Sequence, residues 1–459
     1  MRLKVERLGI NGEGIAVIPD GEFKNKICFI DGALPEEIVD VKIVSNKKNF
    51  CTGQIIEVLE KSPYRVNPPC KYFGSCGGCD IQHLTKELQK KMKQDNVCST
   101  IKKIAKIDVN VEDTVRLNDI GYRNKMAFPY VCENEENVLG MFAKNSHKIV
   151  DIDKCLLTSN SLNKFFQLSK EFLKTSKYKG YDFKSHSGDI KYLVARAKGD
   201  NSILVTFVVT RKLNLDAYYD MLKTHFEKVG LSLVISNSND EIMSGKYYHI
   251  KGDEYLELEE FGIKYRLDNR GFLQVNNDIK HYLYNFILSN VEPNMTVIDA
   301  YSGAGLLSAI ISKKCRNVTG IEINQSASNS ANELSKINNL SNVTYICGDV
   351  KDNLSTQLMH SENCMIVLDP PRAGCDESVL NLLVSSALEN IQNNAELSGK
   401  NKVCKVSKII YVSCNVATLA RDLGVLKEAY EVEKIIPLDM FPQTRHAEVV
   451  CVLKQKNNV

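Results

Sequence analysis

The sequence has no tryptophan, only 8 histidines and no long hydrophobic run among its 459 residues. No apolar segment approaches the about 20 residues of a membrane-spanning helix, so we expect no membrane association. The first residues, Met-Arg-Leu-Lys-Val-Glu-Arg, lack the apolar core of a secretory signal. We therefore expect a cytoplasmic protein whose 15 cysteines stay reduced, because disulfides are rare in reducing compartments.

A strong net charge is also missing. The formal net charge is +3, which excludes a polycation that binds nucleic acid by bulk charge. One stretch is nevertheless basic, because seven lysines between residues 86 and 106 face only Glu87 and Asp95. Such a stretch suits either contact with RNA phosphates or a solvated helix face.

Residues 1–58 alternate short apolar runs with turns rich in glycine and proline. The runs lie at 8–18, 26–30, 38–44 and 50–58. Strands at this spacing predict a small closed barrel. A proline-rich linker at 62–69 follows the predicted barrel.

Three cysteines behind this linker form the first chemical motif. Cys70, Cys76 and Cys79 are separated by five and two residues, and the glycines among them let a short loop wrap around one centre. Zinc sites and iron–sulfur clusters both favour four ligands. The motif therefore predicts a metal site with a fourth thiolate from elsewhere, for which the candidates are Cys98, Cys132 and Cys155.

The region from 80 to 270 mixes helices and strands. Apolar residues at helical spacing predict a long basic helix over 80–113, which we expect to pack on the C-terminal domain. The pattern also predicts helices near 160–175 and 214–228 and a strand at 203–209. The segment Tyr122-Arg123-Asn124-Lys125 combines an aromatic ring with cations, which suits either RNA contact or a plain surface loop.

From residue 271 onward, strands and helices alternate, which predicts a doubly wound parallel sheet. A buried strand at 296–300 ends in a turn with Tyr301, Gly303 and Gly305, where glycines let a ligand approach the backbone. The next strand ends at Glu322, 23 residues after Asp299, where an acid suits ribose hydroxyls. A polar stretch at 391–406 indicates an exposed insertion.

Two further strands end at Gly348-Asp349 and at Asp369-Pro370-Pro371-Arg372. Ser308 stands where a dinucleotide-binding enzyme would carry its third glycine, which argues against a pyrophosphate ligand. The four strand ends together resemble those of class I methyltransferases, which bind S-adenosylmethionine.

The apolar strand at 409–412 ends at Ser413-Cys414-Asn415. Ligands bind at the carboxyl ends of the strands in open parallel sheets. Cys414 is therefore a thiol at the predicted active-site crevice. The alternative is an inert core cysteine, the usual state of a free thiol.

Five motifs identify the family that the chain resembles. They lie at 271–276, 299–305, 369–374, 411–423 and 439–448, and they look like those of the RNA uridine-5-methyltransferases. The N-terminal segment resembles a TRAM domain, and with its cysteines the chain is most similar to the iron–sulfur enzymes that methylate large-subunit (23S) ribosomal RNA. The transfer-RNA branch commonly lacks both features. Gln443 and Val416 depart from the pattern, where histidine and proline are common.

The resemblance implies a multidomain α/β protein. Its implied parts are a TRAM domain at 1–58, which is an OB-like RNA-binding barrel, a central α+β iron–sulfur and RNA-binding domain at 59–270, and a class I (Rossmann-like) methyltransferase domain at 271–459. A [4Fe–4S] cluster, as a structural staple, is implied on Cys70, Cys76, Cys79 and Cys155. S-adenosylmethionine is implied on Gln274, Tyr301, Glu322 and Asp369, and catalysis by Cys414 and Glu448.

The implied reaction explains the need for a thiol. Uracil C5 is a poor nucleophile, and a thiolate that adds to C6 gives C5 the character of a carbanion. By family match, Cys414 makes this attack and Glu448 removes the C5 proton after methyl transfer. We expect a monomer that acts on large-subunit ribosomal RNA. The alternatives are a transfer-RNA uridine-5-methyltransferase, an amino-methyltransferase, which can share the Asp-Pro-Pro motif, and a non-catalytic RNA-binding factor.

Overall fold

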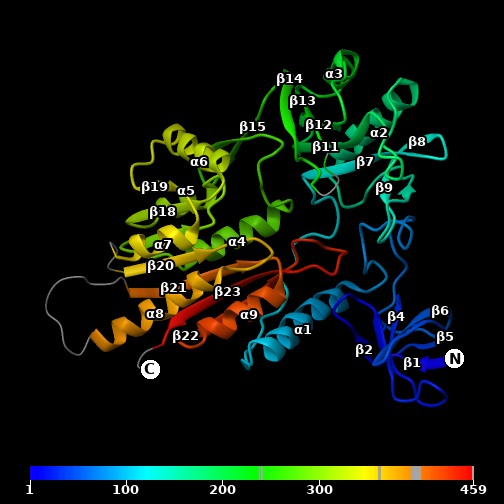
Figure 1. Cartoon of the computed structure of the whole chain (residues 1–459), viewed down its shortest axis with the longest axis horizontal. Helices are drawn as coiled ribbons and strands as arrows, with labels where there is room; N and C mark the ends of the chain where they lie inside the picture. Colours follow the sequence, from blue (N-terminus) through cyan, green and yellow to red (C-terminus); the bar gives the residue numbers. More distant parts are fainter. Residues whose placement is uncertain (237, 239–240, 360–362, 394–404, 457–459) are drawn as a thin grey trace.

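The computed structural model describes residues 1–459 except 237, 239–240, 360–362, 394–404 and 457–459. Figure 1 shows an N-terminal sheet in blue, a central sheet in cyan and green, and a C-terminal sheet in yellow to red. Of the polar insertion predicted at 391–406, residues 394–404 lie outside the described residues. None of the described helices is long and apolar enough to cross a lipid bilayer.

The N-terminal sheet has the strand order β1-β5-β6-β4-β3-β2 and surrounds one small core that includes Leu3, Cys28 and Val41. Its strands are β1 (Arg2–Lys4), β2 (Arg7–Leu8), β3 (Gly14–Val17), β4 (Ile27–Asp31), β5 (Ile38–Asn46) and β6 (Phe50–Glu60). The four predicted runs match β3 to β6, whereas the short β1 and β2 were not predicted as separate strands. Glu36 precedes β5 in the left-handed region with φ 71°, where glycine is the usual residue.

Helix α1 (Lys86–Ile104) is shorter than predicted, so the helix expected over 80–113 is wrong at both ends. It begins after Thr85, whose side chain accepts the N–H of Leu88 at 3.3 Å. It ends at Ala105, and Lys106 turns the chain away with φ 56°. Helix α1 packs against α9 (Val416–Leu426) of the C-terminal domain.

The central region has a six-stranded sheet with the order β14-β13-β12-β11-β7-β8. Helices α2 and α3 cover one of its faces, where Phe165, Phe166 and Tyr218 are fully buried. The elements of this region are β7 (Lys125–Glu133), β8 (Glu136–Leu139), β9 (Met141–Phe142), β10 (Ile149–Val150), α2 (Asn160–Thr175), β11 (Ile190–Lys198), β12 (Ser202–Val209), α3 (Asp216–Lys223), β13 (Lys228–Ile235) and β14 (Lys246–Gly252). A hairpin of β15 (Leu256–Glu260) and β16 (Ile263–Leu267) leads to the C-terminal domain.

The C-terminal sheet has the order β19-β18-β17-β20-β21-β23-β22, in which β17 to β21 are parallel and β23 runs antiparallel to both of its neighbours. Helices α4, α5 and α6 pack on one face, and α1, α7, α8 and α9 pack on the other. The elements are α4 (Asn277–Ser289), β17 (Thr296–Ala300), α5 (Leu306–Ser312), β18 (Asn317–Glu322), α6 (Gln325–Ile337), β19 (Val343–Cys347), α7 (Val350–Met359), β20 (Asn363–Leu368), α8 (Glu377–Asn393), β21 (Lys405–Ser413), β22 (Tyr430–Leu438) and β23 (Glu448–Gln455). The doubly wound sheet predicted from residue 271 is confirmed.

Candidate active site

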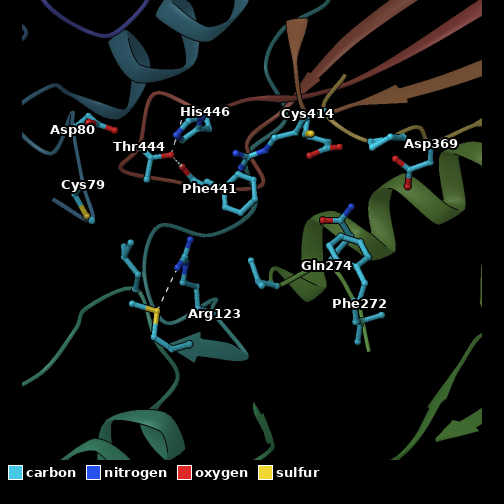
Figure 2. A pocket seen from close by; sticks show the side chains of 18 of the residues that line it. Cys79, Asp80, Arg123, Phe272, Gln274, Asp369, Cys414, Phe441, Thr444 and His446 are labelled. Atoms are coloured by element: carbon cyan, nitrogen blue, oxygen red, sulfur yellow. Dashed lines mark hydrogen bonds between the residues drawn. The ribbon is translucent and has the colours of Figure 1, made fainter. Parts of the chain in front are cut away.

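One cavity of about 1290 Å³ collects every side chain that the sequence predicts for the site. Its walls include Cys70, Cys76, Cys79, Cys155, Gln274, Tyr301, Glu322, Asp369, Cys414 and Glu448. The parallel strands β17, β18, β20 and β21 end at this cavity, which is where open α/β sheets bind ligands. Figure 2 shows Cys414 and Asp369 on one side and Cys79 on the other.

Cys414 follows the buried strand β21 directly and is exposed to the cavity. Asn415 caps α9 by accepting the N–H of Ala417 at 3.1 Å. Val416 is the first residue of that helix, a position where proline is merely favoured, so valine leaves the turn intact. The local chain therefore fixes the thiol at a strand end that faces the cavity.

Three charged groups, Glu448, Asp369 and Arg372, act on the Cys414 thiol. Partial burial and the nearby Glu448 carboxylate raise its pKa, because both disfavour the thiolate. The Arg372 guanidinium is near enough to act in the opposite direction and to favour the thiolate. Arg372 is held in place because Asn415 Nδ2 donates to its carbonyl oxygen at 3.1 Å. This arginine is the nearest cation available to stabilise a thiolate.

Glu448 is the first residue of β23, and only 3% of its surface is exposed. Burial and the nearby Asp369 raise its pKa against the opposing effect of Arg372, and the net value is about 8. A carboxyl with a pKa near neutrality is suited to exchange protons at physiological pH.

The turn after β17 contains two unusual backbone positions. Tyr301 has φ 68°, which is rare for a residue with a side chain. Gly305 has φ 79°, and a Cβ there would approach the Tyr345 hydroxyl to 2.6 Å, so only glycine fits. Glu322, at the end of β18, accepts the Gly303 N–H at 2.9 Å. A hydrogen bond thus joins the glycine turn to Glu322, the two features that the sequence predicts to bind a ligand.

Asp369 and Gln274 complete the predicted set. Asp369 follows β20, and desolvation together with the Asp299 carboxylate raises its pKa to about 7. Gln274 precedes α4, and its backbone carbonyl accepts a hydrogen bond from Asn124 Nδ2 at 3.3 Å. Asp349 also faces the cavity. Several carboxylates therefore surround this end of the cavity, which favours a positively charged ligand.

The four cysteines of the predicted metal site lie on the opposite wall. Burial and the charges of the other three thiols together raise the pKa of Cys79 to about 12, so the other three lie within electrostatic reach of Cys79. The rival ligands Cys98 and Cys132 do not line this cavity. In the described part of the chain, no group of three or more His, Cys, Asp or Glu is arranged to hold a single metal ion.

The cysteine loop is joined to the chain segment that leads into Glu448. The amides of Asp80 and Ile81 donate to the carbonyl of Gln443 at 3.1 and 3.2 Å. The Asp80 carboxylate pairs with Arg445 at 3.2 Å. Gln443 has φ 71° and is buried, so the residue that departs from the family pattern is held at this junction.

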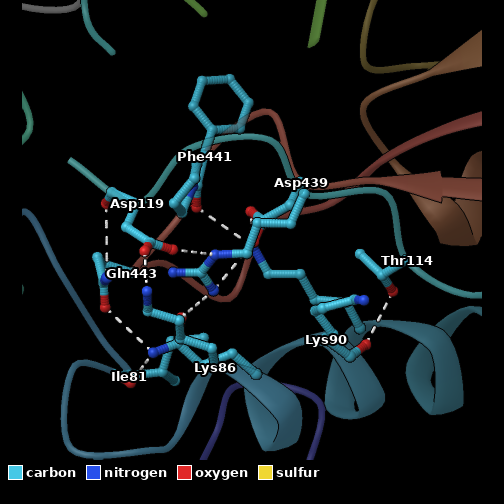
Figure 3. Close-up of polar contacts among 12 residues, drawn as sticks. Ile81, Lys86, Lys90, Thr114, Asp119, Asp439, Phe441 and Gln443 are labelled. Carbon is cyan, nitrogen blue, oxygen red and sulfur yellow. Dashed lines mark hydrogen bonds and ion pairs between the residues drawn. The ribbon is translucent and has the colours of Figure 1, made fainter. Parts of the chain in front are cut away.

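A network of buried ion pairs stabilises the chain segment that leads into Glu448 (Figure 3). Lys93 of α1 pairs with Asp439 at 2.5 Å, and both side chains are fully buried. Arg116 pairs with the same carboxylate at 3.4 Å. Lys93 also donates to the carbonyl of Phe441 at 3.2 Å. One lysine of the predicted basic stretch is therefore structural and not available to RNA.

We expect Lys93→Met to destabilise the protein by about 3 kcal/mol, because it leaves the buried Asp439 carboxylate with only the more distant Arg116. Lys91→Met is the matched control, since Lys91 forms an exposed pair with Asp95 at 3.2 Å. An exposed pair of this kind contributes at most about 0.5 kcal/mol. Urea-induced unfolding of both variants measures the difference, and equal midpoints would contradict a structural role for Lys93.

The structure adds one functional candidate that sequence reasoning missed, Arg372, whose charge acts on the Cys414 thiol. Of the segment 122–125, the Arg123 side chain faces the cavity, and its guanidinium lies 5.9 Å from the Phe441 ring centre. The rest of the segment 122–125 does not form an RNA-contacting surface loop. Tyr122 is buried and donates to the carbonyl of Pro442 at 3.1 Å, and Lys125 donates to the carbonyl of Asn269 at 2.7 Å.

Comparison with known proteins agrees with this arrangement. The family model described as tRNA (Uracil-5-)-methyltransferase matches residues 85–456, and the TRAM domain model matches residues 1–56. An uncharacterized RNA methyltransferase of Halalkalibacterium halodurans is 32% identical over 100% of this chain and 97% of its own length. A second one, from Listeria innocua, is 32% identical over 99% of this chain and 98% of its own length.

A solved structure has a similar fold along nearly the whole chain. It is the Pyrococcus abyssi tRNA (uracil-54, C5)-methyltransferase in complex with S-adenosyl-L-homocysteine, with a TM-score of 0.75 and 24% identity. The alignment covers 99% of this chain and 100% of that one. The chain therefore belongs to the tRNA (uracil-5-)-methyltransferase family, the enzymes that methylate C5 of uracil in RNA with S-adenosylmethionine, and it carries an N-terminal TRAM domain.

Proposed function

We propose that this enzyme methylates a uridine of large-subunit ribosomal RNA, with Cys414 as the nucleophile and Glu448 as the base. The observation that carries the proposal is the convergence of Cys414, Glu448 and Asp369 on one cavity. The charges of Glu448 and Asp369 both influence the Cys414 thiol, so the three groups lie within electrostatic reach of one another.

In the proposed reaction, the Cys414 sulfur adds to C6 of the flipped uracil, and the electron pair of the C5=C6 bond moves toward C5 and O4. S-adenosylmethionine supplies the methyl group that C5 then takes up. Glu448 removes the C5 proton, the C6–sulfur bond breaks, and the C5=C6 bond forms again. Arg372 favours the thiolate at both the addition and the elimination step.

The side chains at the strand ends that face the cavity suit the chemical groups of S-adenosylmethionine. We assign Gln274, Tyr301, Glu322 and Asp369 to the cofactor. The carboxylates favour a sulfonium cation, and Glu322 stands at a strand end suited to ribose hydroxyls. Phe272 and Ile323, exposed by 77% and 67%, offer apolar surfaces to flat rings at the same cavity.

We further propose that Cys70, Cys76, Cys79 and Cys155 hold a [4Fe–4S] cluster. The four thiols line the same cavity, and the charges of Cys70, Cys76 and Cys155 act on Cys79, which supports four ligands around one centre. Methyl transfer from a sulfonium moves no net electrons. The cluster would instead fix the loop whose amides hold Gln443.

An anaerobic preparation is expected to be brown and to contain about four irons per chain. Cys155→Ser should lower the iron content strongly, whereas Cys132→Ser, on β7 and away from the cavity, should leave it unchanged. Iron and acid-labile sulfide analysis measures both variants. Stoichiometric zinc in the wild type, or equal iron in both variants, would overturn the cluster assignment.

The choice of ribosomal RNA rests on the TRAM domain together with the four cysteines. Transfer RNA is the second candidate, because the matching family model and the solved Pyrococcus enzyme both carry transfer-RNA names. Mapping 5-methyluridine in both RNA pools of a deletion strain separates the two. Loss confined to ribosomal RNA supports the proposal, and loss confined to transfer RNA replaces it with the second candidate.

A further inference from the structure

A second cavity of about 230 Å³ lies beside the first, between the central sheet and the hairpin β15–β16. It is smaller than the about 300–1,000 Å³ of ordinary ligand pockets, so it suits a small ion and not a nucleoside. Its walls include Arg123, Ser159, Ser161, Arg196, Gly199 and Leu273. Arg123 and Leu273 also line the large cavity, so the two spaces are neighbours.

Arg196 of β11 is the first observation that points to a ligand. Only 2% of its surface is exposed, and Nη2 donates to the carbonyl of Gly271 at 2.6 Å. Within the described residues, neither Nε nor Nη1 of Arg196 has a hydrogen-bond partner, and the same holds for Nε of Arg123. Burial lowers the pKa of Arg196 to about 10. A buried guanidinium with two free donors is costly unless an acceptor meets it.

The N-terminus of α2 is the second, independent observation. Ser159 caps this 16-residue helix, and its hydroxyl accepts the N–H of Leu162 at 3.4 Å. The amides of Asn160 and Ser161 have no partner inside the helix, as in every first turn. The first turn carries no acidic residue, so the positive end of the helix dipole is not compensated there. Ser159 and Ser161 bring this end to the cavity that Arg196 lines.

Two acids line the cavity, the exposed Asp200 and the partly buried Glu260. Glu260 pairs through Oε1 with Lys280 and accepts the Tyr265 hydroxyl at 2.8 Å. Its Oε2 has no partner in the described chain. Lys280 compensates the Glu260 carboxylate, and the Asp268 charge partly offsets that of Arg196, but neither carboxylate meets the free Nε and Nη1 donors of Arg196.

We propose that this cavity binds one phosphate-class oxyanion, held by Arg196 and by the first amides of α2. The ligand is either a phosphodiester of the RNA substrate, next to the nucleotide that enters the large cavity, or a free phosphate. Binding of an RNA phosphodiester at this site depends on the proposed function, the methylation of RNA by this enzyme. Binding of free phosphate does not depend on it.

Three variants of the full-length chain test the proposal. Arg196→Gln removes the free donors. Asn160→Asp adds a negative charge at the first turn, which weakens anion binding but favours the helix, so its Tm should be no lower than that of the wild type. Lys177→Gln, an exposed cation outside the cavity, is the control.

Isothermal titration with inorganic phosphate is the first measurement. Saturable binding that weakens at least tenfold in Arg196→Gln and Asn160→Asp, and not in Lys177→Gln, supports a free-phosphate site. The second measurement is the salt dependence of affinity for a transcript that contains the mapped uridine. A slope reduced by about one in Arg196→Gln, together with weaker binding by Asn160→Asp, supports the phosphodiester source.

The proposal is overturned if neither phosphate titration nor the RNA salt slope distinguishes the two variants from Lys177→Gln. Methylation is assayed separately on the same samples. An inactive wild type with an intact phosphate site would remove the proposed function and leave the anion site standing.

Discussion

Cys414→Ala is expected to abolish methylation while S-adenosylmethionine still binds. The sulfur is the only part of the residue that the reaction uses, and the side chain faces the cavity, not the core. Without the thiolate, C5 of uracil stays a poor nucleophile, so turnover should fall by at least about 10⁴-fold, as for other covalent catalysts. The fold should be unaffected, because strand β21 ends before this residue.

Cys347→Ala provides the matched control. Cys347 is also an exposed thiol at the end of a parallel strand, β19, but it does not line the large cavity. Methyl transfer from labelled donor to RNA measures activity, and calorimetric titration of S-adenosylmethionine measures cofactor binding. Turnover retained in Cys414→Ala, or lost equally in Cys347→Ala, would contradict the nucleophilic role.

The C-terminal domain could be predicted from sequence because its signals are local. Parallel strands buried on both faces read as short apolar runs, and each run ends at the residue that faces the cavity, as at Tyr301, Asp369 and Cys414. The strand order could not be read from these runs alone. It depends on which strand edges meet, and the antiparallel β23 brings Glu448 next to the end of β21.

The sequence predicted the helix at 80–113 wrongly because apolar spacing does not mark where a helix stops. The Thr85 cap and the left-handed Lys106 set the real ends. Charge was equally misleading within the helix. Lys93 reads as part of a basic face, but Asp439, far away in sequence, makes it a buried ion-pair partner.

Three active-site features depend on tertiary contacts that no local pattern encodes. Arg372 was visible only as the residue after Asp-Pro-Pro, and its role emerges from the effect of its charge on the pKa of Cys414. The segment 122–125 looked suited to RNA, but its Tyr122 hydroxyl and Lys125 amine hold backbone carbonyls of the C-terminal half. The four cysteines converge on one wall, whereas the sequence offered three candidates for the fourth.

Glu448→Gln is expected to accumulate a covalent adduct between Cys414 and methylated RNA. The amide keeps the shape of the side chain but cannot take the C5 proton, so the reaction should stop after methyl transfer. The C6–sulfur bond cannot break until that proton leaves. A band of protein joined to RNA should therefore survive denaturation, at a yield near one per active site in single-turnover conditions.

The pH dependence gives an independent check of the same residue. Burial raises the pKa of Glu448 to about 8, so below pH 8 the carboxyl is mostly protonated and cannot act as a base. The rate of proton release from C5 should rise with pH until about 8, by close to tenfold per pH unit below it. Glu448→Gln should lose this dependence and be no less stable than the wild type, because ionising the buried carboxyl destabilises the fold as pH rises from about 4.5 to 8.

Glu433→Gln separates the catalytic effect from a general change in charge. Glu433 lies on β22 with an exposed side chain, away from the large cavity. Adduct formation is followed by denaturing gel electrophoresis with labelled RNA, and release of tritium from C5 follows the proton directly. If Glu448→Gln releases tritium as fast as Glu433→Gln and leaves no adduct, another group removes the proton and Glu448 is a structural carboxyl.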